Sequence, residues 1–304
     1  MKKEELIELI RFVRFGGPGS GRTKEGGIDK ETSGSGKIGN QSPEQISAKY
    51  QNEAQANVDK LLSSPEIDTL KLYSDKDGNF NEERVAFQKE IVDKEMSKGS
   101  TNLGTSYFLG GAPATGKSSL ETSGLVTYPS GILKVDPDGI KTQLPEYNKM
   151  LETKNFQAAA KVHEESSKLS KDIVKNAANN KFDTVIDAVG DGSYESVADK
   201  VKIQRDAGKN VIAHYVTTDV KTSLDRAKIR GEKTGRYIPP KYIKEMHKEI
   251  SNIFPKLSKN NVFNELHLYD NNGTTPKLIY SKSNGKETIY NSTAYKKFLN
   301  KSKG

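Results

Sequence analysis

One motif constrains the fold of this chain more than any other: a short apolar run followed by G-x-x-x-x-G-K-S, over residues 106–119. The glycines let the backbone turn so tightly that several peptide N–H groups point at one anion. In this motif Lys117 adds charge at the β- and γ-phosphates, and Ser118 can bind Mg²⁺. The sequence therefore predicts that the phosphates of ATP or GTP bind at Gly111, Ala112, Pro113, Ala114, Thr115, Gly116, Lys117, Ser118 and Ser119.

Composition narrows the class of protein. The 304 residues are enough for one large α/β domain with appendages. A net charge of +8, spread along the chain, suits anionic small molecules and does not require nucleic acid. With no cysteine, the chain has no disulfide, thiolate nucleophile or Cys-ligated zinc, which fits the cytoplasm. No segment is apolar enough to predict a membrane span.

The chain divides into three predicted parts. Residues 1–15 have apolar side chains at helical spacing and predict a short amphipathic helix. Residues 16–43 are dominated by Gly, Ser, Lys and Thr, which predicts a flexible linker. Residues 44–304 form the predicted folded domain, because periodic apolar segments run through it.

After the phosphate loop, strand and helix patterns alternate, which predicts an α/β fold with a doubly wound parallel sheet and flanking helices. The expected strands are 106–109, 131–135, 184–187, 211–217 and 265–269, and the clearest helices are 157–179, 194–207 and 220–232. Residues 277–290 predict a hairpin, and 291–300 a closing helix. Ligands of such sheets bind at the carboxyl ends of the strands.

Carboxylates follow two of these strands. Asp136 and Asp138 come after the second, where one of them could take the proton of an acceptor hydroxyl. The same Asp-Pro-Asp-Gly run is also typical of a turn or a helix N-cap. Asp187 closes the third strand as a Walker-B-like or substrate-binding acid, the alternative being a strand-end turn. The polar run 163–167 is predicted to be mostly a solvated helix face.

Three arginines, Arg226, Arg230 and Arg236, fall within eleven residues of a chain whose cations are mostly lysine. Arginine offers a fixed fork of donors to phosphate. We predict a mobile lid that closes on the transferring phosphoryl group. The alternative is a basic, solvated helix end.

With these motifs in place, residues 79–281 resemble the zeta toxin family of P-loop kinases. The resemblance rests on the phosphate loop, on residues 135–138 followed by Lys141 and Pro145, on the strand end 186–190, and on the run from Arg230 to Pro239. Residues 81–84 also look like the lead-in of the family. Members of this family are known as kinases that phosphorylate UDP-activated amino sugars.

The resemblance implies roles for individual residues. Asp138 would be the base, while Lys117, Arg230 and Arg236 would stabilise phosphoryl charge. Asp187 stands where the family has an acid that contacts substrate, and we assign Asp136, Lys141 and Arg226 to the substrate as well. Where the family commonly has Gly-Thr-Gly-Arg after this acid, the chain has Ala-Val-Gly-Asp at 188–191. An antitoxin protein is an expected partner.

The main expectation is a kinase that transfers the γ-phosphoryl of ATP or GTP, with Mg²⁺, to a hydroxyl of a small molecule such as a UDP-amino sugar. A polynucleotide kinase shares the same motifs, but the sequence lacks a stripe of aromatic and basic residues. A third reading is a non-catalytic nucleotide-binding adaptor. The glycine-rich N-terminal region is weakly similar to phage head proteins, so a phage origin fits this reading.

Overall fold

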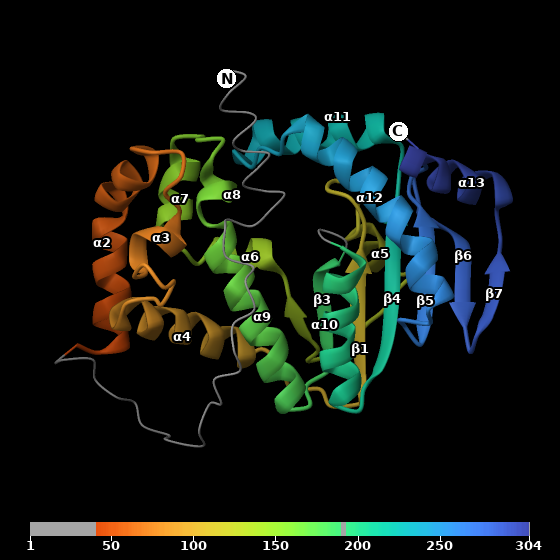
Figure 1. The fold of residues 1–304 in the computed structure, drawn as a ribbon, viewed down its shortest axis with the longest axis horizontal. Helices are drawn as coiled ribbons and strands as arrows, with labels where there is room; N and C mark the ends of the chain where they lie inside the picture. The colour runs from red at the N-terminus through yellow and green to blue at the C-terminus, as the bar shows by residue number, and fades with distance from the viewer. Residues whose placement is uncertain (1–40, 190–192, 304) are drawn as a thin grey trace.

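The structure is a computed structural model that describes residues 41–189 and 193–303. The helix predicted at 1–15, nearly all of the linker predicted at 16–43, and part of the 188–191 turn lie outside the described residues. The described chain forms one seven-stranded sheet in the order β2-β3-β1-β4-β5-β6-β7 (Figure 1).

The predicted strands are all present. They are β1 (Thr105–Gly110), β2 (Leu133–Val135), β3 (Thr184–Val189), β4 (Asn210–Thr217) and β5 (Glu265–Asp270), and they pair in parallel. The predicted hairpin is β6 (Lys277–Ser283) and β7 (Lys286–Ile289), which extends the sheet in antiparallel fashion beyond β5. The α/β prediction is confirmed, and the sheet is mixed because the hairpin forms its edge.

Twelve α-helices are described, and several of their boundaries follow from capping residues. Ser42 and Asn81 accept backbone hydrogen bonds at the starts of two helices, and Gly235, in the left-handed conformation, ends a third. The helices are α2 (Pro43–Leu62), α3 (Thr69–Tyr73), α4 (Glu82–Met96), α5 (Ser119–Thr122), α6 (Pro137–Lys141), α7 (Pro145–Glu152), α8 (Ala158–Lys161), α9 (His163–Asn179), α10 (Tyr194–Asp206), α11 (Val220–Thr234), α12 (Pro240–Lys259) and α13 (Ser292–Asn300).

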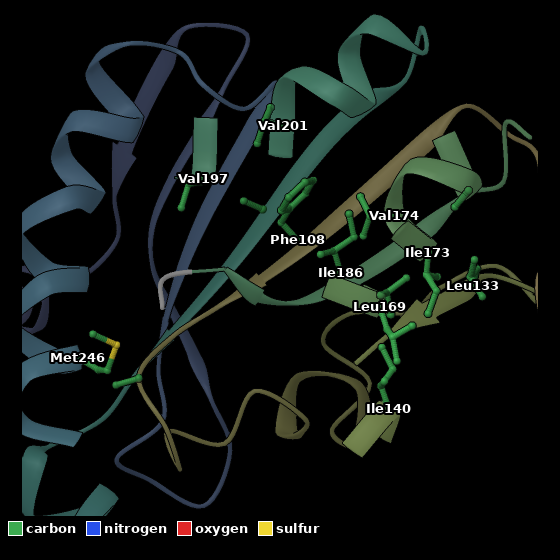
Figure 2. Close-up of a cluster of buried hydrophobic side chains, with 14 of the residues drawn as sticks. Phe108, Leu133, Ile140, Leu169, Ile173, Val174, Ile186, Val197, Val201 and Met246 are labelled. Carbon is green, nitrogen blue, oxygen red and sulfur yellow. The ribbon is translucent and has the colours of Figure 1, made fainter. Parts of the chain in front are cut away.

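The main hydrophobic core lies between the sheet and helices α9, α10 and α12. Phe108 and Ile186 of the sheet belong to one cluster with Leu169 of α9 and Val201 of α10 (Figure 2). Because neighbouring residues of a strand point to opposite faces, Leu109 lies on the other face, with a small cluster that includes Leu120 of α5. Most of the buried apolar surface therefore stabilises one face of the sheet.

A second layer at the N-terminal side, α2 to α4, is joined to α7 and α9 by a buried ionic cluster. Arg84, which is fully buried, donates to Glu165 at 2.7 and 2.8 Å and to Glu146 at 3.1 and 3.2 Å. Burial opposes the ionised state of both partners, yet the pairing raises the pKa of Arg84 and lowers that of Glu165. The guanidinium also lies 4.0 Å from the ring centroid of Tyr73. This cluster fixes the N-terminal helices against α9.

Two local predictions need correction. The helix predicted over 157–179 is two helices, because the backbone at Val162 leaves helical geometry (φ −115°, ψ 7°). The last two residues assigned to the linker already belong to the first described helix, since Ser42 caps α2 and Pro43 occupies its first turn. No helix in the described part of the chain is long and apolar enough to cross a membrane.

Candidate active site

The phosphate loop joins β1 to α5 at the carboxyl edge of the sheet. Gly111 and Gly116 have φ of 142° and 86°, values that favour glycine. A Cβ on Gly111 would lie 2.5 Å from the carbonyl oxygen of Val216, so the loop also needs glycine for its close approach to β4. Thr115 closes a turn by donating from Oγ1 to the carbonyl of Ala112 at 2.9 Å. The loop thus turns tightly between β1 and α5, and its two glycines occupy positions that other residues would strain.

The two carboxylates after β2 have different surroundings. Asp136 caps α6 by accepting from the backbone N–H of Asp138 at 2.9 Å, so the N-cap alternative holds for this residue. Burial raises the pKa of Asp136, and the nearby charge of Asp187 adds to the rise. The Asp138 carboxylate instead contacts two cations, Lys141 at 3.1 Å and the guanidinium of Arg236.

The arginines after β4 come from two elements. Arg230 belongs to α11, whereas Arg236 follows Gly235 in the turn that leads into α12. Burial lowers the pKa of both, although a guanidinium stays protonated in proteins. The Nε of Arg230 is buried without a hydrogen-bond partner in the described structure. Such a donor is available for an anionic ligand.

Arg226 contacts the phosphate loop directly. Its two terminal nitrogens donate to backbone carbonyls, Thr115 at 3.2 Å and Asn271 at 3.2 Å. The Asn271 side chain donates to the same Thr115 carbonyl at 2.8 Å. The sequence analysis did not select Asn271, and its position just after β5, at the carboxyl edge, was the available signal.

One cavity of about 450 Å³, a usual size for a small-molecule site, is lined by the phosphate loop, the two carboxylates and the three arginines. Every predicted site residue lines it except Ala112, which is buried in the core, and Ser119. Five lining side chains are Lys or Arg and three are Asp, so the cavity favours anions. Two of these side chains pair with each other: Lys117 Nζ lies 3.3 Å from Asp187 Oδ1.

One wall of the cavity comes from α8 and α9. His163, Ser166 and Ser167 line it, together with Ala159 and Ala160. The prediction of a mostly solvated helix face for 163–167 is therefore wrong: Glu165 and Ser166 are fully buried. Glu165 is buried because it pairs with Arg84, and Ser166, the next residue, is turned toward the cavity. Tyr237, Tyr242 and Met246 also line the cavity.

The oxygen donors fit Mg²⁺ held mainly by a nucleotide. Ser118 and Asp136 both line the cavity and offer the hard oxygen ligands that Mg²⁺ prefers. Within residues 41–189 and 193–303, no three His, Cys, Asp or Glu side chains group closely enough to hold a metal alone. Such a site matches the usual case, in which substrate phosphates supply the remaining ligands.

The comparisons with known proteins identify the family and the fold. The family model for zeta toxin matches residues 89–284. Among solved structures, the complex of AvrRxo1-ORF1 and AvrRxo1-ORF2 with ATP aligns with a TM-score of 0.60 and 18% identity, covering 77% of this chain and 82% of that one. The PezAT toxin-antitoxin system of Streptococcus pneumoniae aligns with a TM-score of 0.55 and 16% identity, covering 74% and 95%. No curated protein sequence matches the chain.

Proposed function

Because the chain belongs to the zeta toxin family, we propose that it is a kinase that transfers the γ-phosphoryl group of ATP or GTP to a hydroxyl of a small molecule. The observation that carries this proposal is the convergence of four parts on one cavity: the phosphate loop, Asp138, Arg230 and Arg236. Phosphoryl transfer depends mostly on positioning and on stabilising charge, and this constellation supplies both.

The proposed roles follow from these positions. Loop N–H groups and Lys117 bind the β- and γ-phosphates, and Lys117 exchanges its contact with Asp187 for phosphate oxygen. Asp138 accepts the proton of the acceptor hydroxyl. The oxygen of that hydroxyl bonds to the γ-phosphorus while the bond from the γ-phosphorus to the β-γ bridging oxygen breaks. Arg230 and Arg236 stabilise the charge on the transferring group. Ser118 would hold Mg²⁺, which neutralises phosphate charge when bound.

The wall formed by α8 and α9 is the proposed acceptor side. Its small side chains and hydroxyls leave room for a polar ligand, and UDP-activated amino sugars are the first candidates. We also propose that a second protein restrains this kinase in the cell, since the PezAT relative is a toxin-antitoxin system.

A transfer assay tests the function. We would incubate the protein with γ-labelled ATP or GTP and a panel of sugar nucleotides, nucleosides and oligonucleotides. Label should pass to one class of small acceptor, and the Lys117→Ala variant should lose both nucleotide affinity and turnover. Transfer to oligonucleotide ends alone would favour a polynucleotide kinase, and binding without transfer to any acceptor would favour an adaptor.

A further inference from the structure

The carbonyl of Thr115 accepts hydrogen bonds from two side chains that lie far away in the sequence. Asn271 donates from Nδ2 at 2.8 Å, and Arg226 donates from Nη1 at 3.2 Å. Arg226 also donates from Nη2 to the backbone carbonyl of Asn271, so the two side chains are joined to each other. We refer to Arg226 and Asn271 as the carbonyl clamp.

The carbonyl clamp sets the direction of the Gly116 N–H, which follows Thr115 in the chain. A trans peptide holds its C=O and N–H on opposite sides, so a carbonyl fixed toward the clamp turns the N–H of Gly116 away from it. The clamp also packs tightly, because a Cβ on Gly116 would lie 2.3 Å from Asn271 Nδ2. In a phosphate loop, such backbone N–H groups are the donors to the phosphate chain.

The clamp is itself held by the sheet. Asn271 is 3% exposed, and its backbone N–H donates to the carbonyl of Thr217 at the end of β4 at 2.8 Å. Its side chain therefore has a fixed position before any ligand binds. A donor that is already oriented does not lose conformational freedom on binding, which increases affinity.

We propose that Asn271, assisted by Arg226, is a positioning residue that aims the Gly116 N–H at the phosphate chain of the bound nucleotide. The proposal rests on the nucleotide site of the proposed function but not on phosphoryl transfer. Asn271 acts through the loop backbone, so its effect depends on phosphates and not on the base.

The test measures binding by calorimetry for ATP, ADP and inorganic tripolyphosphate. Asn271→Leu removes the donor at similar size, and we expect all three ligands to lose about tenfold in affinity, the equivalent of roughly 1.4 kcal/mol. Asn272→Leu is the matched control, since Asn272 binds the Asp219 N–H at 2.8 Å and Thr218 at 2.9 Å. The control should stay within twofold of the wild type.

Several results would overturn the proposal: unchanged affinities, an equal loss in the control, or a loss for ATP with tripolyphosphate unaffected. Thermal unfolding without ligand checks that Asn271→Leu is folded. If it is not, Asn271→Ala, which also lacks the donor and adds no charge, decides by the same criteria. Wild-type protein that binds ATP but transfers no phosphoryl group would refute the kinase and leave this inference standing.

Discussion

Replacing Asp138 by Asn should separate nucleotide binding from phosphoryl transfer. The Asp138 carboxylate pairs with Arg236, and the two side chains are 34% and 27% exposed. The cation proposed to stabilise the phosphoryl group is thus held by the carboxylate proposed to take the proton. ATP has to compete for Arg236, and that competition disappears when the carboxylate becomes an amide.

The effects of Asp138→Asn on ATP affinity and on kcat differ in size and sign. An ion pair this exposed contributes about 1 kcal/mol or less, so its removal should tighten ATP binding by at most about fivefold. Loss of a general base should lower kcat by about 10²- to 10⁴-fold. Tighter binding with a much slower reaction is an uncommon combination for a site substitution, and simple damage to the site would give weaker binding.

Calorimetric ATP titration and γ-phosphoryl transfer at saturating ATP measure the two quantities. Arg236→Gln supplies the control background, since it removes the arginine pair and leaves Asp138 only its contact with Lys141. There, Asp138→Asn should leave ATP affinity within about twofold. A gain that persists would mean that the carboxylate acts by repelling phosphate or by holding Lys141, and not through Arg236, and a kcat within tenfold of wild type would refute the base assignment.

Three further predictions concern stability. Arg84→Met leaves two glutamates buried without their cation and should cost about 3–5 kcal/mol in urea unfolding, and a loss below 1 kcal/mol would contradict the buried cluster. Burial lowers the pKa of His214 to about 3 from 6.5, so the unfolded state takes up the proton first and stability falls as pH drops through this window. His214→Phe should lessen that fall by up to about 1.4 kcal/mol per pH unit, and identical acid profiles would refute a neutral buried histidine. Gly110→Ala places a Cβ 2.4 Å from the Tyr215 ring and should cost about 1–3 kcal/mol, measurable as a lower Tm, whereas an unchanged Tm would show that the ring can move aside.

The sequence predicted what depends on local pattern. The five parallel strands and the hairpin each have a signature within a few residues, and each is found in the structure. The glycine-rich motif lies between a strand and a helix, β1 and α5, as its flanking pattern predicted. What failed depends on distant partners. Glu165 was predicted to lie on a solvated helix face because it is charged. Its partner Arg84 is 81 residues away, and nothing near Glu165 in the sequence indicates this pairing.

The surroundings of the phosphate loop and the wall of α8 and α9 show the same limit. Asn271 reaches a loop carbonyl 156 residues away, and an asparagine after a strand has no local feature that distinguishes it from a turn residue. The break between α8 and α9 at Val162 was also missed, since apolar spacing continues through it. Contacts made across the fold, and not composition, give these residues their roles.

The wall of α8 and α9 has a consequence for how this protein can change. The Arg84 cluster ties α9 of that wall to α4 and α7, while the phosphate loop is held by the sheet and the carbonyl clamp. We therefore expect substitutions at Ala159, Ala160, His163 and Ser167 to alter the proposed acceptor wall more than the phosphate loop. A library randomised at these four positions is the one we would use to select new acceptor specificity while nucleotide binding is retained.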